Sequence, residues 1–420
     1  MENASFIIEG GRRLSGEIEI QGAKNSVLPI LAAAVLCEGK CVIHKCPRLS
    51  DVDSAVAILE HLGCKVNRLD TSVEVDASVI ERSHIPARLM RRMRSSVIFL
   101  GALLGRTGEA DAAYPGGCEL GPRPIDLHLG ALSQMGAVIT EEYGHIICKS
   151  GAAKETCIDL SFPSVGATEN IMLFAARGRA RVTIINAARE PEIADLGEFL
   201  NKAGARVRGA GTGVITIEGS LRLSGCEHTV ISDRIAAATY MCAAAATGGE
   251  ITINGADPAH LGSIAAAMKQ SGCRIALGER AVSIEAPKEI RPVKLIRTMP
   301  YPGFPTDAQA ILMAYLTRAR GVSVFIENIF ESRYRHADEL VSMGADISVN
   351  GRVCVVSGVG ELTGARVRAC DLRGGAALAV AALSARGTSE IYNISHIERG
   401  YERFDEVLSS LGAQIMRKKI

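Results

Sequence analysis

The chain has 420 residues, of which 47% are hydrophobic and 22% charged, and its formal net charge is +1. This length suits two compact domains. A net charge this close to zero argues against nucleic acid or an anionic membrane as a partner. Because the N-terminal segment lacks a basic and apolar leader, and twelve cysteines in so large a chain favour reduced thiols, we expect a cytoplasmic protein without a membrane span.

A short phrase recurs along the chain at intervals of roughly 70 residues. In it a glycine is followed by a small residue and, two positions later, by Val or Ile. The glycines of the phrase are Gly63, Gly136, Gly204, Gly272, Gly344 and Gly412. The spacing is too regular for chance and too long for a solenoid repeat, so the sequence predicts six similar units.

The same order of elements is predicted in each unit. An apolar, Ala-rich helix ends in a glycine, as at residues 30–40, 171–180, 240–250, 311–321 and 377–387. A short strand follows, as at 41–45, 181–186, 250–255, 322–328 and 389–393. An amphipathic helix, as at 51–63 and 194–204, leads to the glycine of the phrase, and alternating strands then form a hairpin, as at 205–219 and 345–358.

The first helix of these units is apolar around its full circumference, which is typical of helices buried on every side. We therefore expect an α/β fold with helices inside and strands outside, in two domains of three units each. The opening strands at residues 6–20 resemble strands that close other units, so we expect them to pair with the C-terminal half. The predicted domains are 1–21 plus 231–420, and 22–230.

Three motifs are better explained by structure than by function. Cys37, Cys41, His44 and Cys46 lie within ten residues, as zinc ligands can. Matching the repeats makes His44 an ordinary polar residue at a strand end, equivalent to Asn186, Asn254, Glu327 and Asn393. The glycine-rich run at 209–214 lies between two strands, so we interpret it as a hairpin turn and not as a phosphate loop. The charged residues near 400–408 indicate a solvated helix face.

Residues that only one unit carries indicate where function lies. Six of them are cations, two are carboxylates and one is a thiol: Lys24, Arg94, Arg123, Arg333, Arg373, Arg399, Asp307, Asp371 and Cys118. The runs 24–34, 121–132 and 371–383 place a cation at or just before a predicted buried helix, where backbone N–H groups and the helix dipole also attract anions. This set predicts an anion-binding site with acid and base groups.

Two members of this set also have structural interpretations. Asp307 precedes a helix, so its carboxylate could be an N-cap. Cys118 could be a cysteine tolerated in a loop, although the flexible Gly116-Gly117 before it and Arg123 after it favour chemistry, since a nearby cation lowers the pKa of a thiol.

Motifs along the whole chain resemble those of the UDP-N-acetylglucosamine 1-carboxyvinyltransferases, members of the enolpyruvyl transferase family. The most specific is PGGC followed by GPRP, at residues 115–124. The others, in order, are KN at 24, SVGATEN at 164, AAREPEI at 187, SDRI at 232, FPTD at 304, ESR at 331, DLR at 371 and RGYER at 399. The resemblance implies two inside-out α/β barrels of three units each, with the active site in the cleft between them.

The implied reaction moves enolpyruvate from phosphoenolpyruvate to the 3′-hydroxyl of UDP-N-acetylglucosamine and releases phosphate, through a tetrahedral intermediate. It is the first committed step of peptidoglycan synthesis, hence of cell-wall biogenesis, cell shape and division. No cofactor or metal is implied, and we expect a monomer or weak homo-oligomer. By resemblance Cys118 is the proton donor, can carry a pyruvate adduct and is alkylated by the antibiotic fosfomycin. Asp307 is the implied base, with Asp371 as a partner in proton transfer.

The resemblance also implies which residues bind the substrates. Lys24, Arg123 and Arg399 belong to the phosphate of phosphoenolpyruvate, and Arg333 and Arg373 to its carboxylate. The nucleotide sugar is implied to contact Asn25, Arg94, Arg123, Pro124, Ile125, Asp126, Leu127, Ser164, Val165, Gly166, Asp307 and Ile329. Two alternatives stay open: a 3-phosphoshikimate 1-carboxyvinyltransferase, which would share the fold and the cations, and a non-catalytic paralogue that binds nucleotide sugar and regulates wall synthesis.

Overall fold

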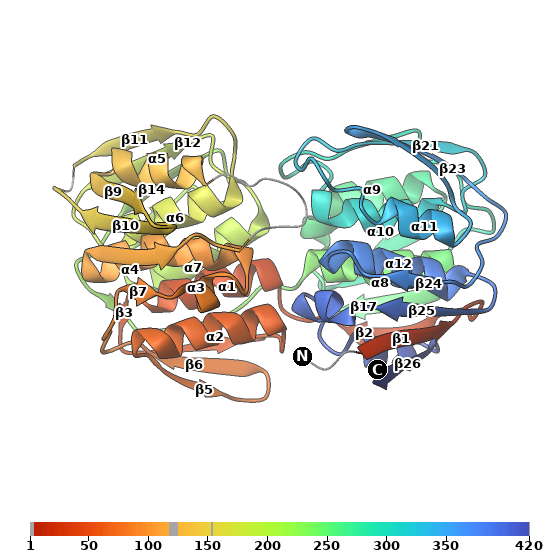
Figure 1. Ribbon diagram of the computed structural model, residues 1–420, viewed down its shortest axis with the longest axis horizontal. Helices are drawn as coiled ribbons and strands as arrows, with labels where there is room; N and C mark the ends of the chain where they lie inside the picture. Colours follow the sequence, from red (N-terminus) through yellow and green to blue (C-terminus); the bar gives the residue numbers. More distant parts are fainter. Residues whose placement is uncertain (1–3, 117–124, 153, 420) are drawn as a thin grey trace. The chain divides into compact units, whose positions relative to one another are not determined.

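The chain forms two compact units in a computed structural model that describes residues 4–116, 125–152 and 154–419 (Figure 1). One, here called the terminal unit, contains residues 4–21 and 232–419. The other, here called the middle unit, contains residues 22–116, 125–152 and 154–231. The chain therefore passes from one unit to the other at residues 21–22 and 231–232.

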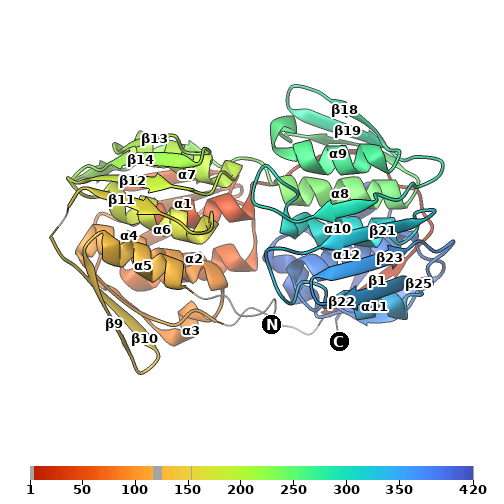
Figure 2. The same cartoon turned by 90° about the horizontal axis from the view of Figure 1, so that it is seen from above.

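The core of each unit is made of helices whose residues are almost all buried. In the middle unit they are α1 (Lys24–Ala34), α4 (Phe99–Thr107) and α6 (Val165–Ala176), and in the terminal unit α8 (Arg234–Ala246), α10 (Thr306–Leu316) and α12 (Leu372–Ser384). Small and aliphatic side chains on all sides let α10 pack against both α8 and α12, and α4 against α6. Within each unit the sheets lie outside these helices, as predicted (Figures 1 and 2).

Six four-stranded sheets are formed by the described residues. Those of the middle unit are, in spatial order, β16 (Glu227–Thr229), β4 (Lys40–His44), β6 (Ser72–Asp76), β5 (Lys65–Arg68); β7 (His84–Ile85), β8 (Glu109–Ala113), β10 (His145–Ser150), β9 (Ala137–Glu142); and β11 (Thr156–Asp159), β12 (Arg181–Ile185), β14 (Val214–Glu218), β13 (Arg206–Arg208). A further short pair joins β3 (Cys37–Glu38) and β15 (Leu223–Ser224). In each four-stranded sheet the first two strands are parallel and the rest antiparallel.

The sheets of the terminal unit repeat this pattern but use both ends of the chain. They are β2 (Ser15–Glu19), β17 (Glu250–Asn254), β19 (Ala281–Glu285), β18 (Arg274–Leu277); β20 (Leu295–Arg297), β21 (Val322–Ile326), β23 (Val353–Ser357), β22 (Asp346–Asn350); and β24 (Arg366–Arg368), β25 (Thr388–Tyr392), β1 (Ala4–Glu9), β26 (Gln414–Lys419). Phe6 on β1 is opposite both Ile391 and Arg417, so the N-terminal strand completes the hairpin of the last unit. The expected pairing of the opening strands with the C-terminal half is confirmed.

The amphipathic helices end where the repeated glycines predict. They are α2 (Ser50–Leu62), α5 (Asp126–Gln134), α7 (Pro191–Ala203), α9 (Gly262–Gln270), α11 (Ala337–Ser342) and α13 (Phe404–Ser410). The glycine after each has a positive φ, for example 103° at Gly63 and 111° at Gly204. Because L side chains rarely adopt this conformation, glycine ends the helix at the lowest cost. The remaining short helices are α3 (Ala87–Met90), η1 (Arg94–Ile98), η2 (Pro258–Leu261) and η3 (Ile394–Arg399).

The structure confirms the turn at 209–214 and corrects two details. Gly209 and Gly211 have positive φ in the hairpin between β13 and β14. The predicted match of His44 with Asn186 and Asn393 is wrong by one residue, because Lys45, with φ 53°, takes their left-handed position after the strand. The run 121–132 leads into α5, which exposes Asp126 and Gly130 and is therefore not a buried helix.

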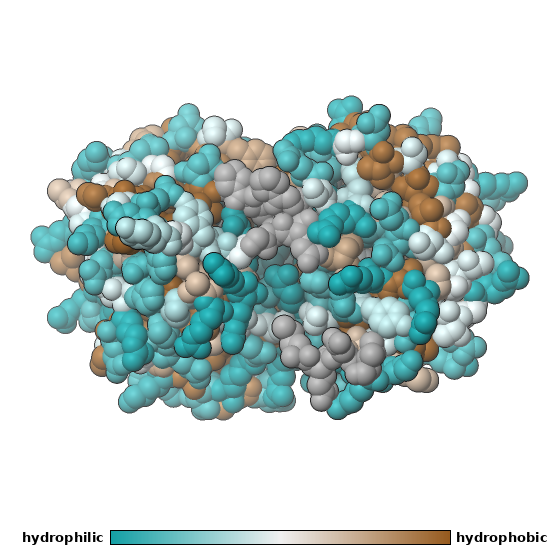
Figure 3. All heavy atoms as spheres, viewed as in Figure 1, coloured by the Kyte–Doolittle hydropathy of each residue, from teal (hydrophilic) through white to brown (hydrophobic). Residues whose placement is uncertain are grey.

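Hydrophilic side chains cover most of the face of each unit seen in Figure 3. Apolar side chains gather over β21 and β23, where Val322 and Val353 are exposed. None of the helices in the described ranges has the length and apolarity that a bilayer span requires.

Candidate active site

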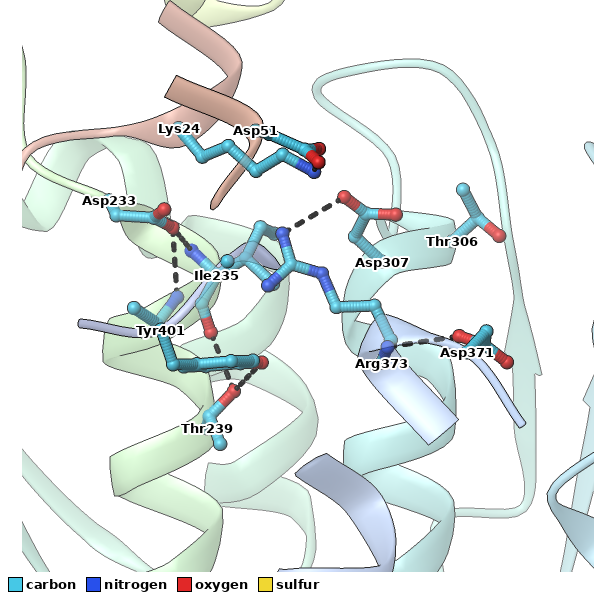
Figure 4. A network of polar contacts seen from close by, with 12 residues as sticks. Lys24, Asp51, Asp233, Ile235, Thr239, Thr306, Asp307, Asp371, Arg373 and Tyr401 are labelled. Atoms are coloured by element: carbon cyan, nitrogen blue, oxygen red, sulfur yellow. Dashed lines mark hydrogen bonds and ion pairs between the residues drawn. The ribbon is translucent and has the colours of Figure 1, made fainter. Parts of the chain in front are cut away.

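In the terminal unit, the first turns of α8, α10 and α12 bring polar side chains together (Figure 4). Asp233 caps α8 by accepting from the backbone N–H groups of Ile235 and Ala236, both at 2.9 Å. Asp371 caps α12 by accepting from those of Arg373 and Gly374, at 2.9 and 3.0 Å. N–H groups in a first helical turn carry partial positive charge, and the two capping carboxylates stabilise that charge at the starts of α8 and α12.

Asp307 lies in the first turn of α10 and pairs with two arginines. Arg333 Nη2 donates to its Oδ1 at 3.0 Å, and Arg373 Nη2 donates to its Oδ2 at 3.2 Å. The N-cap position of α10 is Pro305, and α10 has no side-chain cap. The alternative interpretation of Asp307 as an N-cap is therefore wrong, and its carboxylate is available to hold the two guanidinium groups.

Arg373 is almost completely buried, with its guanidinium 5.4 Å from the centre of the Tyr401 ring. The Tyr401 hydroxyl lies 2.8 Å from Thr239 Oγ1, which donates to the Ile235 carbonyl and so fixes the ring (Figure 4). Burial lowers the pKa of Arg373, but electrostatic interactions with Tyr401 and Asp307 outweigh burial and raise it overall. Arg373 Nε and Nη1 have no hydrogen-bond partner within the described chain, so this permanent cation keeps donors for an anion.

Arg333 is buried as deeply, and two of its three guanidinium nitrogens donate hydrogen bonds within the protein. Its Nε and Nη2 donate to the Thr306 carbonyl at 3.3 and 3.1 Å, and its Nη1 lies 3.8 Å from Asp371 Oδ1. Burial raises the pKa of Asp371, but the Arg333 charge and the two capping N–H groups outweigh it and hold that pKa below its ordinary value. Arg333 thus ties the starts of α10 and α12 together.

The other two predicted residues of the terminal unit are Ile329, four residues before Arg333, and Arg399, two residues before Tyr401. Ile329 is half-buried, and its backbone N–H donates at 2.8 Å to Glu327, a buried carboxylate that also accepts from the Thr306 hydroxyl at 3.0 Å. Glu327 therefore connects the Ile329 loop to the first residue of α10. Arg399 is half-buried at the end of η3, two residues before Tyr401.

In the middle unit, Lys24 begins α1 and is buried in an ion pair. Its Nζ lies 2.7 Å from Asp51 Oδ2, and the two side chains are only 10% and 3% exposed. Asn25 follows it and is half-buried. A lysine so enclosed is held in one orientation, as a point-charge ligand for a phosphate would need.

A second polar cluster of the middle unit surrounds His128 on α5. Its Nδ1 lies 2.7 Å from Asn170 Nδ2, and Asn170 also donates to the Val97 carbonyl at 3.1 Å. Burial, aided by the charge of Arg94 at the start of η1, lowers the pKa of His128 to about 4. A side chain at Gly166 would meet the His128 ring at 2.8 Å, so this glycine permits the close approach of α6 to α5.

The other predicted residues of the middle unit lie at the starts of α5 and α6. Ser164 caps α6 by accepting from the Ala167 N–H at 3.3 Å, with Val165 and Gly166 in the first turn. Ile125 is buried before α5, Asp126 is exposed and Leu127 is half-buried. Cys118, Arg123 and Pro124 lie outside the described residues.

Several partners of these residues were not predicted from the sequence. They are Asp51, His128, Asp233, Thr239, Glu327 and Tyr401. In the sequence, Asp51 is typical of an acid in a first helical turn, and Tyr401 is part of a charged run. Neither residue type indicates which distant residue it contacts. The motifs offer a signal for two of them, because Asp233 lies inside SDRI and Tyr401 inside RGYER.

Comparison with known proteins defines the class of the protein. Residues 8–408 match the family model of EPSP synthase (3-phosphoshikimate 1-carboxyvinyltransferase). The enolpyruvyl transferase NikO from Streptomyces tendae superposes with a TM-score of 0.90 at 26% identity, over 100% of both chains. EPSP synthase from Acinetobacter baumannii, at 19% identity and a TM-score of 0.77, covers 99% of this chain and shares the fold. The predicted enolpyruvyl transferase fold is thus confirmed.

Curated relatives narrow the class. UDP-N-acetylglucosamine 1-carboxyvinyltransferase 2 of Caldanaerobacter subterraneus is 51% identical over 98% of this chain and 99% of its own length. UDP-N-acetylglucosamine 1-carboxyvinyltransferase 1 of Symbiobacterium thermophilum is 46% identical over 99% and 95%. The chain belongs to the UDP-N-acetylglucosamine 1-carboxyvinyltransferase family.

Proposed function

We propose that the chain transfers the enolpyruvyl group of phosphoenolpyruvate to the 3′-hydroxyl of UDP-N-acetylglucosamine and releases phosphate. The observation that carries this proposal is the similarity to enzymes named for this transfer, which are 51% and 46% identical to this chain over 98% and 99% of its length. The buried Arg373, with two donors left over by the protein, supports it, because phosphoenolpyruvate brings a carboxylate and a phosphate that need such donors.

The roles of the charged residues follow from the chemistry of the transfer. Protonation of the methylene carbon of phosphoenolpyruvate makes its neighbour electrophilic, and the sugar hydroxyl attacks that neighbour to give a tetrahedral phosphoketal. Phosphate then leaves as the methyl group loses a proton. We assign the first protonation to Cys118 and the removal of the hydroxyl proton to Asp307. Lys24, Arg123 and Arg399 would stabilise the departing phosphate.

Arg333 and Asp371 have a different role in this proposal. Arg373 would bind the carboxylate of phosphoenolpyruvate, whereas Arg333 has its donors on Thr306 and Asp307. Arg333 would therefore position Asp307. Asp371, as the cap of α12, would position the start of the helix that carries Arg373.

The nucleotide sugar is assigned to the remaining predicted residues. They are Asn25, Arg94, Arg123, Pro124, Ile125, Asp126, Leu127, Ser164, Val165, Gly166, Asp307 and Ile329. We propose that both units act on one pair of substrates. The proposed domains are 22–230, which carries the Cys118 loop, and 1–21 plus 231–420. We also propose that the reaction takes place in the cytoplasm. A monomer or weak homo-oligomer stays a prediction that sedimentation would test.

The product identifies the reaction. Purified full-length chain would be incubated with phosphoenolpyruvate and UDP-N-acetylglucosamine, and the nucleotide sugar would be isolated and examined by mass spectrometry and NMR. We expect a carboxyvinyl ether on the 3′-oxygen. Unchanged nucleotide sugar from folded protein that binds it would favour the regulatory paralogue instead.

A further inference from the structure

Two histidines and an aspartate form a cluster on one sheet of the middle unit, and none belongs to the candidate active site. His84 is on β7, Asp111 on β8 and His145 on β10. His84 and Asp111 are direct cross-strand partners. His145 is two residues from Ile147, the partner of Asp111 on β10, so its side chain lies on the same face.

This face of the sheet is the outer one. Residues that alternate with the cluster, such as Ala110, Ala112 and Ile146, are fully buried, and side chains alternate between the two faces of a strand. The side chains of His84, Asp111 and His145 are 45%, 39% and 34% exposed. The cluster therefore lies at the surface of the unit and outside its core.

The ligand atoms are already close to one another. His145 Nδ1 lies 2.8 Å from Asp111 Oδ1, and His84 Nδ1 lies 3.1 Å from Asp111 Oδ2. The two imidazole rings are almost parallel, at 11°, with their centres 5.7 Å apart. One ligand atom from each side chain lies within 4.8 Å of the others, and the described residues contain no other such group of three. In a tetrahedral zinc site neighbouring ligand atoms are about 3.3–3.6 Å apart, so small side-chain rotations suffice.

His84 provides a second observation that favours a ligand. Its Nδ1 is shielded from solvent and makes no hydrogen bond in the described chain, although a carboxylate oxygen lies 3.1 Å away. A neutral imidazole with a lone pair on this nitrogen would be repelled by that oxygen. A cation bound by both atoms removes the repulsion and uses both lone pairs.

We propose that His84, Asp111 and His145 form a binding site for a divalent transition-metal ion of the Zn²⁺ type, with water completing a tetrahedral shell. Imidazole and carboxylate ligands suit this class of ion. The ion would join three strands and fix β7, an edge strand of two residues. β7 precedes Arg94 in the sequence, and β8 ends at Ala113, shortly before Cys118, so the ion would stabilise the framework from which both segments extend.

Metal titration of the full-length chain tests the site. Apo protein, prepared with a chelator, would be titrated with Zn²⁺ in a calorimeter and with Co²⁺ in a spectrophotometer. We expect one equivalent to bind, with a visible cobalt spectrum typical of a tetrahedral site and without the near-ultraviolet band that thiolate ligands give. The absence of the near-ultraviolet band distinguishes binding at this site from binding at cysteine.

Substitution of each of the three proposed metal-binding side chains tests where the ion binds. His84→Gln, Asp111→Asn and His145→Gln should each weaken Zn²⁺ binding by at least about 100-fold, since loss of supporting residues alone costs about 10–100-fold. His44→Gln is the control, because His44 is also a part-exposed strand histidine that faces a carboxylate, Glu227 at 3.7 Å. Failure of the wild type to bind either ion would overturn the proposal, as would unchanged binding in the three ligand variants. Circular dichroism would establish that each variant is folded.

Discussion

Arg373 Nη2 donates a hydrogen bond to Asp307 Oδ2 at 3.2 Å, which joins the first turn of α12 to that of α10. Asp307 is shared, since Arg333 binds its other oxygen. One carboxylate therefore fixes two buried guanidinium groups, and one of these retains free donors. This arrangement fixes the Asp307 carboxylate beside the donors that an anion would use.

Asp307→Asn should reduce turnover by at least about 100-fold, because an amide cannot accept the hydroxyl proton. Binding of the nucleotide sugar should persist, since the amide oxygen can still accept from one arginine. Steady-state kinetics and calorimetry would separate the two effects. Asp338→Asn is the control, an exposed acid on α11 of the same unit. Retained turnover in Asp307→Asn would remove this residue from the proton transfer.

Two substitutions at Tyr401 separate its ring from its hydroxyl. Tyr401→Phe loses the hydroxyl contact with Thr239 and should cost about 1 kcal/mol of unfolding free energy with little change in kinetics. Tyr401→Leu also removes the ring beside Arg373, an interaction on the order of 1–2 kcal/mol, and should raise the KM for phosphoenolpyruvate about tenfold. Equal kinetic loss in both variants would mean that the hydroxyl, and not the ring, positions Arg373.

Buried histidines should make the protein less stable in acid. Burial lowers the pKa of His336 to about 4 from the ordinary 6.5, and burial does the same for His128. Between these values the unfolded chain binds protons that the folded chain does not, so the free energy of unfolding falls as the pH drops from about 6.5 toward 4. Their full contribution, on the order of 1–3 kcal/mol each, is present above pH 6.5.

Chemical denaturation between pH 7 and pH 4.5 would measure this effect. His336→Leu is the informative variant, because both ring nitrogens of His336 are buried without hydrogen-bond partners in the described chain. Its free energy of unfolding should fall less steeply with pH than that of the wild type. The same slope in His336→Leu and the wild type would show that His336 is not the titrating group.

Cys118→Asp should keep an acid in place and so retain part of the transfer activity, while fosfomycin should no longer form a covalent adduct. The family resemblance makes the Cys118 thiol the alkylated group, and a carboxylate is a weaker nucleophile for an epoxide. Mass spectrometry of the intact protein would report the adduct. Cys157→Ser, which removes an exposed cysteine of the same unit, should react like the wild type. An adduct on Cys118→Asp would place the reactive group elsewhere.

Much of the fold could be predicted because the repeat makes local signals reinforce one another. Six glycines at one position require a left-handed residue after a helix, and the apolar runs before them require burial on every side. The run at 99–107 does not follow the Ala-rich pattern of the other buried helices, since Gly101 and Gly105 interrupt it. The structure explains these glycines by the close approach of α6: a Cβ at Gly101 would lie 2.4 Å from the Asn170 carbonyl oxygen.

The charged residues of the site could be recognised from motifs, but their partners could not. Lys24 stands out at the start of an apolar helix, whereas Asp51 becomes its partner only when α1 packs against α2. Tyr401 is similarly brought to Arg373 by the packing of η3 on α12. In the sequence, Asp307 fits both a cap and a catalytic role, because both place an acid at the start of a helix. The position of the two arginines distinguishes these roles.

Release of inorganic phosphate from phosphoenolpyruvate tests the central claim most directly. Purified chain would receive UDP-N-acetylglucosamine in one reaction, shikimate 3-phosphate in a second and no acceptor in a third. The proposed function predicts rapid release only with the nucleotide sugar, and loss of that release in Asp307→Asn. Release with shikimate 3-phosphate alone would keep the fold and the cation site but contradict the proposed acceptor.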